Sequence, residues 1–349
     1  MSLLRQPSSR KKEHTQLRLP PMLLGTPELV AQHTPCTLHL SILPPQLACR
    51  LFYAMIEASK TWKRNKWWLF DRVVESPHLT SFFARKTDGI DDDESWQEAA
   101  QYWYNGRPTE PPMTFPPEME EACKIIENVV NEQMRKRKTT FSHEWAGKGG
   151  DPLWRANVAA SNCYQGGKES VGFHSDQLTY LGPYPTIASL SLGTRRIFSL
   201  REVIPTDEIG TRKAQTFNIP LPHNSLTIMH ASCQERFKHS IPPQAAIDLF
   251  RPPFPPGGVD SEIAPSNCRI NITFRFYRPD FRPLSIPRCL CGVPTILRPD
   301  MKNRNADETD RYWWACYAGA QNDGKGCKFW KVMNMGEEGR SGLSASPSS

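Results

Sequence analysis

The chain has 349 residues, with 43 lysines and arginines against 36 acidic residues, and a formal net charge of +7 at pH 7. This length is enough for two or three domains, and so mild a basic excess favours an anionic partner only weakly. No run approaches the roughly 20 apolar residues that span a bilayer, and the first residues lack the apolar core of a secretory signal. Ten cysteines in such a chain predict thiols and metal ligands in an intracellular protein, rather than a disulfide framework.

The first half of the chain predicts a tail followed by helices. Residues 1–35 begin polar and basic, without periodicity, and are expected to be disordered. A helix is expected over residues 45–62, and the clearest helix of the chain over 117–137, where apolar residues recur at three- and four-residue intervals. Between them, residues 60–70 place three tryptophans among lysines and an arginine. Such a stretch fits either contacts to phosphates and bases or a helix end that docks on the core.

Short β-type runs separated by turn residues dominate after Phe141. Their number and spacing predict a sandwich of strands, so the expected fold class is mainly β with flanking helices (α+β). The runs are Ala156–Tyr164, Thr186–Leu192, Arg196–Leu200, Ala214–Ile219, Leu226–His230, Phe237–Ile241 and Arg269–Tyr277.

A possible metal site begins at His174-Ser175-Asp176. In an extended backbone, residues two apart point to the same face, so the imidazole and the carboxylate converge. His239, in a second strand-like run, offers a third ligand. Two histidines and one carboxylate with open positions describe the facial triad of non-haem Fe(II) oxygenases. A bare His-x-Asp pair also arises by chance, and two structural side chains remain the alternative.

The run from Cys268 to Tyr277 alternates between apolar and polar residues, which places Arg269 and Arg275 on one face. Two inward-facing arginines are costly unless they meet anions, and an acidic cosubstrate would satisfy them because guanidinium binds carboxylate in a bidentate fork. The alternative is an amphipathic strand with a wet, basic face. Upstream, Asn162 and Tyr164 also share one side of a strand-like run.

The order N-x-Y, H-x-D, H and R-x5-R resembles the AlkB family of Fe(II)- and 2-oxoglutarate-dependent dioxygenases, over residues 36–282. The resemblance implies a double-stranded β-helix, or jelly-roll, with its metal at the mouth of the barrel. It implies that Fe(II) is held by His174, Asp176 and His239. It also implies that 2-oxoglutarate is bound by a further set of residues, namely Arg269 at its far carboxylate, Arg275 near its keto acid, and Asn162 and Tyr164 through hydrogen bonds.

The same resemblance implies a function, the oxidative dealkylation of bases in DNA or RNA by a nuclear, monomeric repair enzyme that acts on a base outside the duplex stack. One position departs from the family. Members that act on methylated adenine or cytosine carry an acidic residue two places after the metal aspartate, where this chain has Leu178. The alkylated base is therefore left open. Two alternatives also remain: a 2-oxoglutarate dioxygenase acting on a protein or small molecule, and a nucleic-acid-binding module with an inactive core.

A second metal signal lies near the C-terminus, where Cys289, Cys291, Cys316 and Cys327 fall within 39 residues. Four thiols in so short a segment predict a structural Zn(II) site; four unlinked cysteines are the alternative. The patterns CxCG and GCxFW resemble a GRF-type zinc finger over residues 286–333, which implies binding to single-stranded nucleic acid. Aromatic residues beside lysines and arginines would form either its stacking platform or the small core around the zinc, namely Tyr312, Trp313, Trp314 and Trp330. Residues 334–349 are expected to be a disordered tail.

Overall fold

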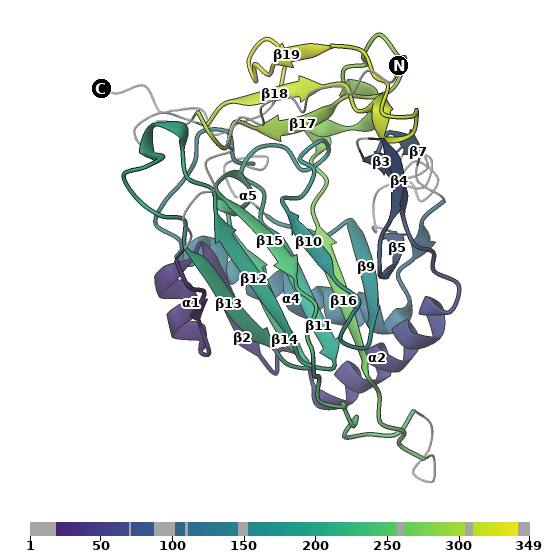
Figure 1. Ribbon diagram of the computed structural model, residues 1–349. Helices are drawn as coiled ribbons and strands as arrows, with labels where there is room; N and C mark the ends of the chain where they lie inside the picture. The colour runs from purple at the N-terminus through teal and green to yellow at the C-terminus, as the bar shows by residue number, and fades with distance from the viewer. Residues whose placement is uncertain are drawn as a thin grey trace, which may run out of the picture.

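The short runs after Phe141 pair into two sheets that face each other (Figure 1). The computed structural model describes residues 19–69, 71–86, 102–108, 111–145, 153–256, 262–303 and 310–340. The five-stranded sheet has the order β1 (Met22–Leu23), β13 (Thr216–Leu221), β12 (Arg196–Glu202), β15 (Phe237–Ile241) and β10 (Val171–His174). The seven-stranded sheet has the order β2 (Cys36–Leu40), β14 (Ser225–Met229), β11 (Ile187–Gly193), β16 (Cys268–Arg275), β9 (Val158–Gln165), β5 (Leu79–Ala84) and β8 (Met113–Thr114).

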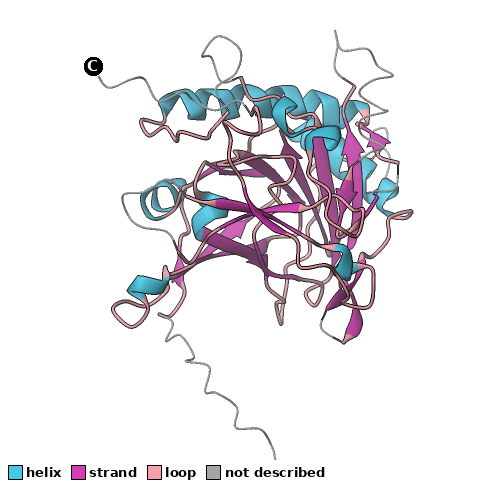
Figure 2. Ribbon diagram, turned by 90° about the horizontal axis from the view of Figure 1, so that it is seen from above, coloured by secondary structure: helices cyan, strands magenta, loops and turns pink. Residues whose placement is uncertain are grey.

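The two faces of the seven-stranded sheet differ in chemistry. Ile270, Ile272 and Phe274 of β16 point outward into one apolar cluster, which they share with helices α2 (Pro45–Ser59) and α4 (Pro117–Lys136). Figure 2 shows these helices along the outer side of the strands. The residues that alternate with Ile270, Ile272 and Phe274 along β16 point to the space between the sheets. The predicted fold class, mainly β with a jelly-roll core and flanking helices, is confirmed.

A buried ion-pair network fastens α4 to the edge of this sheet. Arg85 follows β5, and its guanidinium lies 2.5 Å from Glu120 and 2.6 Å from Glu127, both on α4. The Arg85 side chain is 8% exposed and that of Glu127 is 14% exposed, so this pair is shielded from water and from salt, whereas Glu120 is 31% exposed.

Residues 60–70 do not continue the preceding helix. Lys66–Leu69 forms β3 of a hairpin with β4 (Arg72–Glu75), and Trp62 is buried against Phe83. The prediction of a helix reaching Trp62 is therefore wrong beyond Ser59, where a turn begins. A second small hairpin pairs β6 (Trp103–Tyr104) with β7 (Arg107–Pro108).

The C-terminal segment forms a three-stranded sheet of β17 (Ile296–Pro299), β18 (Tyr312–Ala315) and β19 (Trp330–Val332). We call residues 286–340 the C-terminal module. Figure 1 shows it above the end of the barrel at which the short helix α5 (Cys233–Arg236) lies. Leu297 and Trp314 belong to the same hydrophobic cluster as Leu178 and Leu181 of the barrel. The module is therefore packed on the barrel rather than tethered to it.

The two predicted disordered tails are wrong in part. Residues 22–23 form β1 and Pro27–His33 forms helix α1, with Leu24 and Val30 fully buried. At the other end, Met335 and Arg340 are also buried. Residues 1–18 and 341–349 lie outside the described residues. Among the helices that the structure describes, none has the length and apolarity to cross a bilayer.

The two arginines that contact α4 give a test of the ion-pair network. Arg85→Ala should lower the free energy of unfolding by about 3–5 kcal/mol, because it leaves Glu127, whose side chain is only 14% exposed, without its cation. Arg50→Ala is the matched control, since Arg50 pairs with Glu121 of α4 at 2.9 Å but both side chains are more than half exposed. Its cost should stay within about 1 kcal/mol. Equal losses in urea denaturation would contradict this account.

Candidate functional site

His174 and His239 lie directly opposite each other on neighbouring strands. They pair across β10 and β15, and a shift of register between Val171 and His174 marks a bulge just before the first histidine. Bulges redirect side chains, and here the two imidazole rings lie with centroids 4.3 Å apart. Asp176 lies two residues beyond the end of β10, in the loop that follows.

The three predicted ligand groups converge. Oδ1 of Asp176 lies 3.6 Å from Nε2 of His239 and 3.9 Å from Nε2 of His174. Nδ1 of His174 is 2.8 Å from the carbonyl oxygen of Gly172, which can only accept a hydrogen bond. The proton of a neutral His174 therefore resides on Nδ1, and Nε2 keeps its lone pair for a metal.

The charges around this cluster favour metal binding at neutral pH. Burial raises the pKa of Asp176, but Arg275 and the two histidines outweigh it and hold this pKa at about 2. Burial lowers the pKa of His239 to about 3, so the imidazole is neutral. Arg275 donates from Nε and Nη2 to Oδ2 of Asp176, at 3.0 and 2.8 Å. The carboxylate is thus held by one oxygen, and the other faces the two imidazoles.

Arg269 lies on the same face of β16, six residues before Arg275, and is 1% exposed. Nη2 donates to Ser191 at 2.8 Å, and the guanidinium carbon lies 5.3 Å from the ring centroid of Tyr164. Nε and Nη1 find no acceptor among the described residues. Burial lowers the pKa of Arg269 to about 10, which still leaves a cation. A buried cation with two unused donors fits a carboxylate ligand.

Asn162 and Tyr164 lie on the inner face of β9. In the sheet register, Tyr164 is the partner of Arg269, and Asn162 is the partner of Asn271. The structure therefore brings the predicted residues of β9 and β16 to one wall, whose other end reaches Asp176 through Arg275.

A family model described as the 2OG-Fe(II) oxygenase superfamily matches residues 54–275, which is more than half of the chain. The chain belongs to this superfamily. The oxygenase is 34% identical to alpha-ketoglutarate-dependent dioxygenase alkB homolog 3 of Mus musculus over 38% of this chain and 40% of that protein. It is 29% identical to DNA oxidative demethylase ALKBH2 of Homo sapiens over 34% of this chain and 39% of that protein. It therefore spans about two fifths of the length of these curated relatives.

A solved structure, that of OsALKBH1, is similar over 70% of this chain and 99% of that chain, with 14% sequence identity and a TM-score of 0.41.

Membership of the superfamily implies Fe(II) and 2-oxoglutarate, and the chain has donors suited to both. Nε2 of each histidine and a carboxylate oxygen of Asp176 lie within 4.8 Å of one another, which fits an iron ion. The unused donors of Arg269 fit an acidic cosubstrate. The oxygenase is thus a dioxygenase by family, and its described residues include donor groups suited to both the metal and the cosubstrate.

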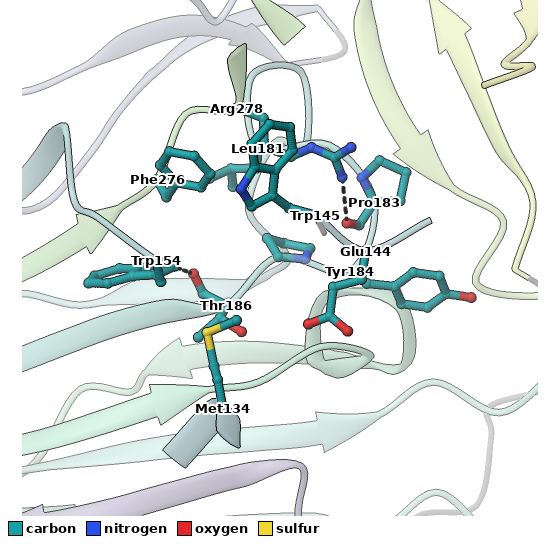
Figure 3. A pocket seen from close by; sticks show the side chains of 11 residues that line it. Met134, Glu144, Trp145, Trp154, Leu181, Pro183, Tyr184, Thr186, Phe276 and Arg278 are labelled. Carbon is teal, nitrogen blue, oxygen red and sulfur yellow. Dashed lines mark hydrogen bonds between the residues drawn. The ribbon is translucent and has the colours of Figure 1, made fainter. Parts of the chain in front are cut away.

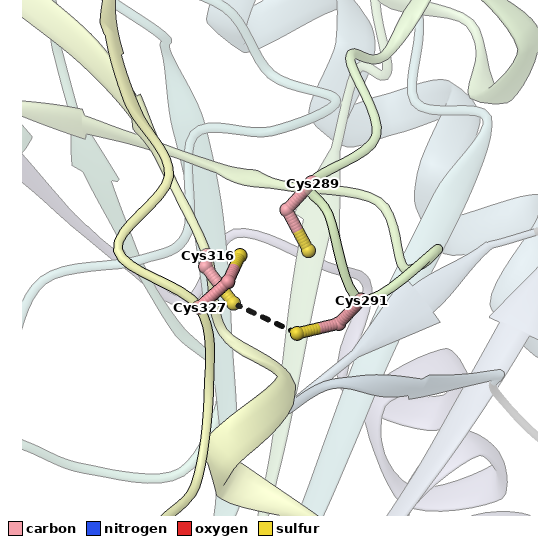
Figure 4. A group of neighbouring side chains, drawn as sticks. All are labelled: Cys289, Cys291, Cys316 and Cys327. Carbon is pink, nitrogen blue, oxygen red and sulfur yellow. Dashed lines mark hydrogen bonds between the residues drawn. The ribbon is translucent and has the colours of Figure 1, made fainter.

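The four predicted cysteine ligands also come together, as Figure 4 shows. All four sulfur atoms lie within 4.8 Å of one another, and those of Cys291 and Cys316 are 4.0 Å apart. Zinc–sulfur bonds of about 2.3 Å in a tetrahedron require sulfur atoms about 3.8 Å apart. All ten cysteines of the chain are free thiols, as the sequence predicts.

Two of the four aromatics predicted to stack on bases are buried. Tyr312 is 2% exposed and Trp314 is fully buried, because β18 packs against the barrel. Their part in a stacking platform is therefore excluded. Trp330, which is 60% exposed, remains accessible.

Figure 3 shows a pocket apart from this site. It is lined by Trp145, Phe276 and the loop around Tyr184, and none of the predicted ligands lines it. Residues that line the pocket form hydrogen bonds with one another. Trp154 donates to the Thr186 carbonyl at 2.9 Å, and Arg278 donates to the Pro183 carbonyl at 3.5 Å.

The sequence analysis missed His78 and a group of tyrosines. The His78 ring stacks on that of Tyr164 at 4.9 Å, and its Nδ1 lies 3.1 Å from the Ser170 carbonyl. Tyr277 packs against two other tyrosines, with ring centroids 4.8 Å from Tyr102 and 5.2 Å from Tyr180. No spacing in the sequence marks these residues, since they come from separate strands and loops.

Buried histidines that are not among the proposed metal ligands should make stability depend on pH. Burial lowers the pKa of His78 and of His230 to about 4, whereas the unfolded value is about 6.5. Between these values the unfolded chain binds more protons, so stability falls as the pH is lowered from about 6.5 to 4, by at most about 1.4 kcal/mol per pH unit for each histidine. Urea denaturation of the iron-free protein at pH 7 and pH 5 measures this loss. His230→Gln should reduce this loss, and a loss of the same size in His230→Gln and in the wild type would contradict the assignment.

Proposed function

We propose that this dioxygenase removes alkyl groups oxidatively from bases of DNA or RNA. The observation that carries the proposal is the wall described above, in which unused donors of a buried arginine and a cluster of two histidines and an aspartate lie on one face. The two relatives named as an AlkB homologue and a DNA demethylase support the substrate class.

Each residue of the wall has a proposed role. His174, Asp176 and His239 hold the iron. Arg269 binds the far carboxylate of 2-oxoglutarate, with Asn162 and Tyr164 beside it. Arg275 fixes the orientation of Asp176 through Oδ2. Bound Fe(II) and 2-oxoglutarate would supply oxidising chemistry, in which one atom of dioxygen hydroxylates an N-alkyl carbon and the other enters succinate as 2-oxoglutarate loses carbon dioxide. A hydroxymethyl group on nitrogen would then leave as formaldehyde.

The substrate base must reach this site from outside a duplex stack. Tyr104, at the tip of the β6–β7 hairpin, is half-exposed, yet its hydroxyl is crowded. Burial of that hydroxyl, together with the Asp176 carboxylate, raises the pKa of Tyr104 to about 12. We propose that this ring borders the base. Leu178 is fully buried in the barrel core and cannot contact the base, so the lesion is not assigned.

Leu178 leaves room for one alternative, a 2-oxoglutarate dioxygenase that acts on a protein or small molecule. Succinate formation separates the two. Turnover of 2-oxoglutarate should rise several-fold with a methylated single-stranded oligonucleotide, with release of formaldehyde, and should not rise with the unmethylated strand. Equal turnover with both strands would favour the alternative.

We further propose that Cys289, Cys291, Cys316 and Cys327 bind Zn(II), and that the C-terminal module contacts single-stranded nucleic acid in the manner of a GRF-type zinc finger. Trp330 carries the stacking role, because it is the exposed aromatic of β19 and lies beside exposed Lys328 and Lys331. Stacking of a base on an aromatic contributes about 1–3 kcal/mol. Trp330→Ala should therefore weaken oligonucleotide binding about 5- to 100-fold, with basal 2-oxoglutarate turnover unchanged.

The role of Arg269 has a sharper test. Arg269→Met should raise the KM for 2-oxoglutarate, because a desolvated carboxylate loses its partner, at a cost of about 2–5 kcal/mol. Arg269→Lys should not restore the wild-type KM, because an ammonium lacks the planar fork. Mn(II) affinity and oligonucleotide affinity serve as controls and should stay at wild-type values. A wild-type KM in Arg269→Met would remove this residue from cosubstrate binding.

A further inference from the structure

The short helix α5 contacts both the loop that carries Asp176 and the C-terminal module. Its consecutive residues Gln234 and Glu235 are polar, and each is only 1% exposed. We propose that Gln234 is a positioning residue for Asp176, and that Glu235 and Tyr312 make the iron site depend on the C-terminal module. This inference rests on the proposed role of Asp176 as an iron ligand.

Gln234 holds the backbone of the metal aspartate. Its Oε1 accepts a hydrogen bond from the Asp176 N–H at 2.8 Å, and its Nε2 lies 3.5 Å from the sulfur of Met229. Asp176 lies beyond β10, which is an edge strand of its sheet. The side chain of Gln234 thus supplies a bond that no neighbouring strand supplies. His239 follows α5 by three residues, so one short segment sets two of the three ligands.

Glu235 joins the same loop to the module. Its Oε1 accepts from the Tyr184 N–H at 2.9 Å and from the Tyr312 hydroxyl at 3.1 Å. Tyr184 has a φ of 51°, a conformation that is rare for a bulky residue and is maintained by its surroundings. The Tyr184 hydroxyl in turn accepts from the Asp310 N–H at 3.1 Å. Two buried bonds thus connect this loop and α5 to the start of β18.

A third hydrogen bond joins the module to this loop, at a residue only three positions after Asp176 in the sequence. The Leu297 N–H of β17 donates to Oγ1 of Thr179 at 3.2 Å, and both residues are buried. A buried polar group left without its partner costs about 1–3 kcal/mol. Detaching the module would therefore leave Thr179 and Tyr184, both in the loop over residues 176–184, without their hydrogen-bond partners Leu297 and Asp310. The linkage is reciprocal, since whatever orders the module also favours the loop conformation that binds iron.

Mn(II) binding to full-length, iron-free protein tests the proposal. Mn(II) prefers imidazole and carboxylate to thiolate ligands, so its electron paramagnetic resonance signal reports the proposed iron site. Tyr312→Phe removes only the hydroxyl and keeps the buried ring. We expect about a 10-fold loss of Mn(II) affinity, the usual size for a group that orients a metal ligand. Gln234→Leu should show a loss of the same order.

Two variants control for general damage. Glu235→Gln should keep wild-type affinity, because burial raises the pKa of Glu235 to about 7 and an amide oxygen still accepts both bonds. Tyr53→Phe, on helix α2, deletes a hydroxyl of the same kind. This hydroxyl donates to the Phe254 carbonyl at 2.9 Å. It should leave Mn(II) affinity unchanged. A lower melting temperature in Tyr312→Phe with wild-type Mn(II) affinity would overturn the proposal.

Asp176→Ala separates this proposal from the proposed function. If Asp176→Ala loses Mn(II) binding while Tyr312→Phe and Gln234→Leu keep wild-type affinity, only the link through α5 is overturned. Unchanged Mn(II) binding in Asp176→Ala would instead overturn the iron site itself. The double variant Glu235→Leu/Tyr312→Phe should lose no more affinity than Glu235→Leu alone, because Glu235→Leu already removes the bond that Tyr312 makes. Additive losses would mean that the two residues act independently.

Discussion

Strand β16 has an apolar face that packs against the helices and a polar face that points into the barrel. Its isoleucines and Phe274 pack against the helices, while Arg269, Asn271 and Thr273 point between the sheets. Because side chains alternate strictly along a strand, the packing that fixes the apolar face also fixes where the two arginines point. The packing of the apolar face thus turns Arg269 and Arg275 toward the barrel interior, and their hydrogen bonds to Ser191 and Asp176 then hold each guanidinium in place.

The two arginines of β16 lie on one face of the strand but differ in their partners and in the direction of their pKa shifts. Arg275 meets the Asp176 carboxylate, which raises its pKa against the effect of burial. Arg269 is buried more deeply than Arg275 and has no carboxylate beside it among the described residues, so burial prevails and lowers its pKa. One arginine is satisfied within the chain, and the other has donors left for a ligand. This difference distinguishes a structural ion pair from a binding group.

The C-terminal module shares buried contacts with the barrel. It contributes Trp314, Tyr312 and Leu297 to a hydrophobic cluster that includes residues of the metal-site loop. Its four cysteines lie on the outer part of the same module, close enough to share one metal ion. The fold of the module and the shape of the loop therefore depend on a common set of buried contacts. A module of this kind can bind a partner only through the residues that this packing leaves exposed, such as Trp330.

The sequence by itself determined what depends on local periodicity and residue chemistry. The alternation on β16, the His-x-Asp pair with its later histidine, the clustered cysteines and the long amphipathic helix α4 can all be read from spacing, because neighbours along a strand or helix fix the face of each side chain. Only the tertiary structure decided which polar and aromatic residues are buried. Tyr312 and Trp314 have the composition of a base-stacking platform, yet they pack on the barrel, and Gln234 and Glu235 carry no motif. Their contacts join segments from 51 to 77 residues apart, and no local pattern encodes such distant pairings.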